Sequence, residues 1–193
     1  MPLNPPTLSA AFLAPNMIAT GNVGIALPKL AQGIAIGVCQ YLSGQSRVVT
    51  VDAGTLGAGT SFMPLIVPTP LVLTSLTAGF ASMGVLGMLA PKLISGLATG
   101  LTSGWLSLAL LQSNHPTVGV GVGVARIVGP SAVAAMISGF ASVGMVGDGP
   151  TKFARAIGMG LDTTFSSFVQ VGIPIVGSPS PIGSSGVGFG SVI

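Results

Sequence analysis

The chain has 193 residues, of which only 5% are charged, against about 25% in an average soluble protein. It contains three aspartates, no glutamate and six scattered lysines and arginines, which leave a net charge of +3. Because the bases form no run or stripe, the composition argues against nucleic-acid binding, and the polar residues are too few for us to expect an enzyme. Apolar residues make up 49% of the chain, so we expect other protein subunits or lipid to cover them.

One sequence unit recurs nearly three times along the chain. Phe80 and Phe140 each stand in a Gly-Phe-Ala-Ser stretch, and Lys92 and Lys152 follow them after the same interval. A looser first copy carries Lys29, again next to a proline. Self-similarity at a period of this length predicts one supersecondary unit used repeatedly, in which each copy buries apolar surface that its neighbours leave open.

The first copy is predicted to begin with a short helix over residues 7–20, which Pro15 breaks. A second helix is expected over 28–42, because a proline suits the first turn, where its missing N–H costs nothing. The β-branched run Val48–Val51 is typical of a strand. A glycine turn over 54–59 and an extended connector over 61–70 follow.

The second and third copies repeat this order. A proline at 91 separates the two helices of the second copy, and the turn signal over 147–150 separates those of the third. The expected helices cover residues 71–88, 92–112, 131–146 and 151–168, the strands cover 117–128 and 169–176, and an extended glycine-rich tail covers 178–193.

The sequence thus predicts an α+β fold class in a single domain over residues 1–193, built of about three repeats at 7–70, 71–130 and 131–193. Each repeat is expected to run helix, turn, helix and strand, joined by extended glycine-rich connectors. A glycine inside a helix costs about 1 kcal/mol relative to alanine, so helices this rich in glycine are expected to persist only where close packing compensates.

Lipid is the alternative medium for burying this chain. Segments 71–90, 93–111 and 131–147 are about long enough to cross a bilayer, and they carry spaced small residues that suit close helix approach. Against this, Trp105 and Tyr41 alone cannot form an interfacial aromatic belt. Residues around 118–124 alternate like a strand, whose exposed edge hydrocarbon does not tolerate. We therefore favour burial in protein and keep the membrane as the alternative.

The residues that could carry chemistry do not form a recognisable site. His115 stands in a link before a proline with no carboxylate near it in sequence, so a solvated loop role is expected rather than a catalytic base. Cys39 is the one cysteine and lies among apolar residues, which favours a small buried side chain. The loop Gly54–Gly59 lacks the Lys-Ser/Thr ending of a phosphate loop. We expect no cofactor and no metal.

The repeated lysines allow two interpretations. They could form a ring of charge that lines a channel or contacts a partner, or they could be solvated lysines at helix starts whose stems cover apolar surface. The candidate interface residues are the three repeated lysines, the two repeated phenylalanines and one phenylalanine of the tail: Lys29, Lys92, Lys152, Phe80, Phe140 and Phe189.

Two stretches, Pro28–Gly37 and Gly54–Ser61, resemble small glycine- and alanine-rich structural proteins of tailed-bacteriophage virions. The resemblance implies a non-enzymatic component of the neck, tail or baseplate, copied around a symmetry axis, and it transfers no functional residue. The expected function is therefore a homo-oligomeric structural subunit of a virion that packs its apolar helices and extended segments against neighbouring subunits and other virion proteins. The alternative is a membrane-active or integral membrane protein, such as a pore, a holin-like protein or a virion membrane protein.

Overall fold

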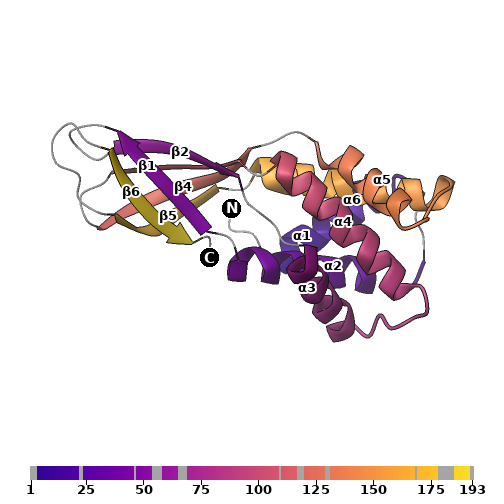
Figure 1. The fold of residues 1–193 in the computed structure, drawn as a ribbon. Helices are drawn as coiled ribbons and strands as arrows, with labels where there is room; N and C mark the ends of the chain where they lie inside the picture. The colour runs from indigo at the N-terminus through magenta and orange to yellow at the C-terminus, as the bar shows by residue number, and fades with distance from the viewer. Residues whose placement is uncertain are drawn as a thin grey trace.

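In the computed structural model, helices gather at one side and strands extend from them at the other (Figure 1). The structure describes the backbone of residues 4–21, 24–45, 47–53, 58–64, 69–108, 110–116, 120–128, 131–167, 169–177 and 185–191. Side chains are described for residues 4–13, 16–21, 24–42, 69–103 and 131–166.

Six α-helices and one π-helical turn form the helical body. Two of the helices begin at caps that the sequence supplies. The Asn4 side chain accepts a hydrogen bond from the Thr7 N–H at 2.9 Å, and Ser131 caps a later helix by accepting from the Val133 N–H. The helices are α1 (Pro5–Phe12), α2 (Leu27–Gln45), α3 (Thr69–Ser82), α4 (Ala90–Leu108), α5 (Ala132–Ser142) and α6 (Asp148–Ser167), with the π-helical turn η1 at Leu13–Met17.

Two strands follow each pair of helices, and all six pair in one antiparallel sheet in the order β1-β6-β5-β4-β3-β2. The last strand pairs along its length with the first, and part of it also pairs with the fifth, so residues 185–191 of the glycine-rich tail lie inside their own chain's sheet. The strands are β1 (Arg47–Ala53), β2 (Ala58–Pro64), β3 (Leu110–Pro116), β4 (Val120–Val128), β5 (Val169–Gly177) and β6 (Ser185–Ser191).

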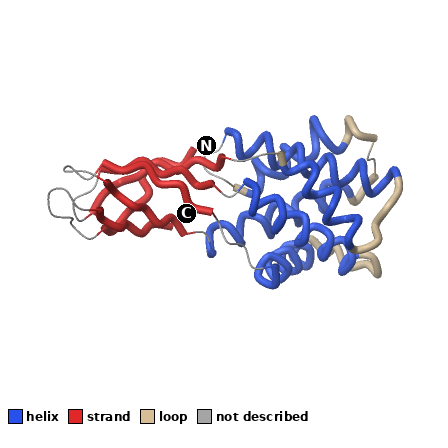
Figure 2. The backbone as a smooth tube through the Cα atoms, turned by 45° about the horizontal axis from the view of Figure 1, so that its top comes forward, coloured by secondary structure: helices blue, strands red, loops and turns tan. Residues whose placement is uncertain are grey.

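The predicted α+β class of helix–turn–helix–strand repeats is wrong. The part of the chain whose side chains the structure describes is all-α, with six helices and no strand. The physical reason is that each helix pair finds its apolar cover on the helices of the other copies. The strands form a sheet of their own, to one side of the helices (Figure 2).

Glycines allow helices of neighbouring copies to pack with their backbones in direct contact. Between α2 and α3, a Cβ added to Gly37 would lie 2.7 Å from the Cα of Leu76. Between α4 and α5, a Cβ added to Gly139 would lie 2.5 Å from the Cα of Gly100. Real Cβ atoms do not approach backbone atoms this closely, so both contacts require glycine. The close packing expected of glycine-rich helices is therefore present between copies.

The same kind of contact closes the three copies into a ring. A Cβ added to Gly160 on α6 would lie 3.1 Å from Cε1 of Phe12 and 3.2 Å from the carbonyl oxygen of Ala11, both on α1. Because the last helix packs on the first, each helix pair has a neighbour on both sides. Phe12 and its counterparts Phe80 and Phe140 are all at most 1% exposed in the core that results.

Two equivalent turns end α3 and α5 earlier than the sequence predicted. Gly84 has a φ of +68° and Gly144 a φ of +70°, the left-handed conformation that ends a helix. The N–H of Val85 donates to the carbonyl of Phe80 at 3.0 Å, as such a cap requires. The helix predicted to reach Met88 therefore ends at Ser82, and residues 83–89 form an exposed turn.

The first copy turns differently because of Pro15. Proline has no N–H to donate to the carbonyl of Ala11, four residues earlier, so the regular helical bond cannot form. The side-chain amide of Asn16 donates to that carbonyl instead, at 2.6 Å, and the backbone widens into the π-helical turn. The break predicted at Pro15 is thus a change of helix type.

Within the described residues, no helix combines the length and hydropathy that crossing a bilayer requires. Segments 71–90 and 131–147 fall on α3 and α5 with the turns that follow them, and segment 93–111 falls on α4 and the first residues of β3.

Replacing Gly139 by alanine is expected to destabilise the helical body. The new methyl group would meet the backbone of α4, which cannot move aside as a flexible side chain can, so the free energy of unfolding should fall by about 1–3 kcal/mol. Chemical denaturation measures this change. Gly87→Ala is the control, because a Cβ there meets nothing within 4 Å; equal losses in both variants would contradict the packing described.

Candidate functional site: the loop end of the helical body

Large apolar side chains are exposed at the turns inside the three helix pairs. Met88 is 99% and Leu86 is 80% exposed between α3 and α4, and Val146 is 70% exposed between α5 and α6. The corresponding turn of the first copy exposes Ile18 and Ile25. We call these three turns, at residues 18–21 with 24–26, 83–89 and 143–147, the loop end.

The three turns share one end because of how the chain runs. Each helix pair is followed by strands of the one sheet, so the turn inside a pair lies at the opposite end of its helices. Figure 2 shows these turns at the side of the helical body away from the strands.

An open hollow of about 310 Å³ lies at the loop end. Leu30, Leu93 and Phe153, which come early in α2, α4 and α6, all line it, so the hollow is built by all three copies. Phe140 also lines it, and its ring lies 5.8 Å from that of Phe153 at an angle of 58°. The lining is apolar, so the hollow suits an aliphatic group better than a polar ligand.

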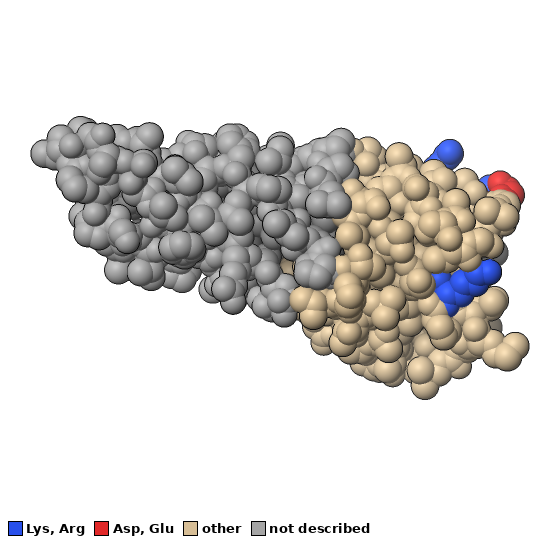
Figure 3. All heavy atoms as spheres, in the orientation of Figure 1, with Lys and Arg blue, Asp and Glu red and all other residues tan. Residues whose placement is uncertain are grey.

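The three repeated lysines stand beside this hollow. Lys29, Lys92 and Lys152 are exposed, and each directly precedes a residue that lines the hollow. The Nζ of Lys92 lies 3.6 Å from where a Cβ on Gly144 would stand, so it reaches the turn of the next copy. Figure 3 shows basic side chains at this end of the helical body.

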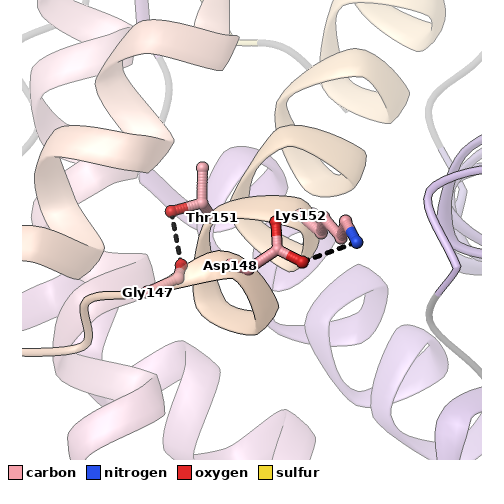
Figure 4. Close-up of polar contacts among 4 residues, drawn as sticks. All are labelled: Gly147, Asp148, Thr151 and Lys152. Atoms are coloured by element: carbon pink, nitrogen blue, oxygen red, sulfur yellow. Dashed lines mark hydrogen bonds and ion pairs between the residues drawn. The ribbon is translucent and has the colours of Figure 1, made fainter.

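One acid accompanies the lysines. The Asp148 carboxylate lies 2.6 Å from the Lys152 Nζ, one helical turn apart (Figure 4). Both side chains are at least half exposed, so the pair adds little stability. Thr151 donates to the carbonyl of Gly147 at 2.7 Å in the same turn. Lys29 and Lys92 stand in the first turns of α2 and α4, where they meet the positive end of the helix dipole, so a nearby anion would be favoured there.

The structure separates Phe80 from this group and brings Phe140 to it. Phe80 is buried in the core of its own chain, and Phe140 is buried at the floor of the hollow. Phe189 lies on β6 and His115 on β3, where side chains are outside the described residues. The region of 54–57, within the glycine turn, is outside the described residues as well.

The exposed apolar residues of the turns were missed by sequence reasoning. Leu86 and Met88 fall within the helix that the sequence predicts over residues 71–88. The useful signal was the glycine that follows both Phe80 and Phe140 after four residues, since a repeated glycine at a helix end indicates a cap.

Cys39 is buried on α2 at 8% exposure, as the sequence predicted. Desolvation by the surrounding apolar residues raises the pKa of this thiol to about 12. Among the described residues, no three His, Cys, Asp or Glu side chains gather as a metal site would require.

Comparisons with protein-family models, with curated proteins and with solved structures found no match to this chain. The loop end combines apolar side chains on three turns, an apolar hollow among them and exposed lysines beside it.

Alkylation of Cys39 is expected to be far slower in the folded protein than in the unfolded chain. A pKa of about 12 lowers the thiolate fraction near neutral pH about a thousandfold relative to an ordinary thiol, and burial limits access as well. Iodoacetamide labelling followed by mass spectrometry measures both rates. Comparable rates with and without denaturant would show that this part of α2 is open.

Proposed function

We propose that the protein is a non-enzymatic structural subunit of a tailed-phage virion, part of a neck, tail or baseplate, where it assembles with copies of itself and with other virion proteins. The resemblance of Pro28–Gly37 and Gly54–Ser61 to such proteins supports the class. The low charge content supports a role in which most of the surface is covered.

The observation that carries the proposal is the exposure of large apolar side chains on the helical body. Those that concern assembly lie on helix sides, where Leu71, Leu73 and Met159 are each about two-fifths exposed. Few charges interrupt these surfaces, and subunit contacts are the usual cover for such patches. The helix sides are suited to contacts between neighbouring subunits.

The closed ring supports the same role. Because α6 packs on α1 through Gly160, the helical body completes its core within one chain and offers neighbours a formed surface. The pairing of β6 with β1 and β5 likewise uses the tail inside the chain. Assembly is therefore expected to join already folded subunits, mainly through side chains on the helices.

Sedimentation velocity of the full chain in detergent-free buffer tests the proposal. We expect one discrete species whose mass is a multiple of the 18.9 kDa chain. Serine at both Leu71 and Leu73 should weaken the assembly about tenfold, because apolar area leaves the contact, while the circular dichroism of the helices stays unchanged. A protein that remains a single chain at every concentration would overturn the proposed function.

A further inference from the structure

We infer that the loop end docks on the surface of an anionic lipid bilayer, with the apolar turns inserted at the level of the headgroups and the lysines facing the lipid charges. This goes beyond the proposed assembly role, which concerns the helix sides, and it can fail while that role stands.

The first support is how far the apolar residues project. Met88 and Ile25 are essentially fully exposed, and Leu86, Leu89 and Val146 are exposed by 70% or more. Most of the surface of these side chains is left uncovered by their own chain. They are placed to enter another medium, as the apolar residues of interfacial segments enter the boundary between headgroups and acyl chains.

The second support is that all three turns reach the same end. Each comes from a different copy, and the hollow lined by Leu30, Leu93 and Phe153 shows that the copies meet there. A broad surface laid against this end would touch the three turns together. The hollow then offers apolar space to a lipid chain.

The third support is charge, which identifies the occupant. Lys29 and Lys92 stand in the first turns of α2 and α4, and Lys152 stands one turn into α6. Asp148, at the start of α6, is paired with Lys152. Lys29 and Lys92 have no ion-pair partner among the described residues. A second copy placed end to end would bring lysines against lysines, so an anionic surface fits better.

Differences among the turns favour lipid over an acidic protein. One turn carries Ile18 and Ile25, another carries Leu86, Met88 and Leu89, and the third carries Val146. A rigid partner would have to match three unlike projections at once. A fluid bilayer accommodates each of them, and long lysine side chains can reach the headgroups while their stems stay in apolar surroundings.

Flotation of the full chain with lipid vesicles tests the inference. We expect the protein to float with vesicles of phosphatidylcholine containing about a third phosphatidylglycerol, to bind pure phosphatidylcholine at least tenfold more weakly, and to lose binding as salt rises. Serine at Leu86, Met88 and Leu89 together should lower binding at least tenfold, and glutamine at Lys29 and Lys92 should lower binding to anionic vesicles about fivefold per lysine.

Two controls make the outcomes distinct. Met159→Ser removes an exposed apolar side chain from the side of α6 and should bind vesicles like the unchanged protein. The triple serine variant should keep its helical circular dichroism and its sedimenting mass, because those side chains support nothing inside the chain. The inference would be overturned if the folded protein bound neither kind of vesicle. It would also be overturned if the triple serine variant bound vesicles as well as the unchanged chain does. Loss of assembly in the triple variant would identify the loop end as a protein contact instead.

Discussion

The close approach of helices at glycine is the constraint on which the rest of this structure depends. Gly37 and Gly139 bring the backbones of successive copies into contact, and Gly160 brings the last copy onto the first. This closure gives every helix pair two neighbours. It also fixes the orientation of all three pairs, so that their strands leave at one side and their turns collect at the other (Figure 1).

Several hydroxyl groups on the helices form hydrogen bonds to the backbone of their own helix. The hydroxyls of Thr74, Thr77 and Thr164 each donate to a backbone carbonyl four residues earlier. These bonds leave the hydroxyl oxygens free to accept from water but use their one donor inside the helix. The few charges cannot cover the remaining apolar area. This is the physical link between an almost uncharged sequence and a protein whose surfaces are suited to contact.

Local sequence signals predicted much of the helical body, but they did not predict the fold class. The repeated lysine and phenylalanine positions marked equivalent points of three copies, and prolines marked the starts of α2 and α4. Non-local pairing could not be predicted: residues 110–112 continue a helical pattern yet lie in β3, and residues 185–191 of the tail pair along their whole length with β1, which is far away in sequence. The apolar turns were missed because hydrophobicity alone does not show that Gly84 ends its helix.

Native-state hydrogen exchange of α1 tests the closed ring most directly. This helix has only eight residues, so on its own it would open readily. If its packing on α6 closes the ring, its amides should exchange as slowly as those of α5 and α6, because all three open together. Fast exchange in α1 while α5 and α6 stay protected would contradict the account.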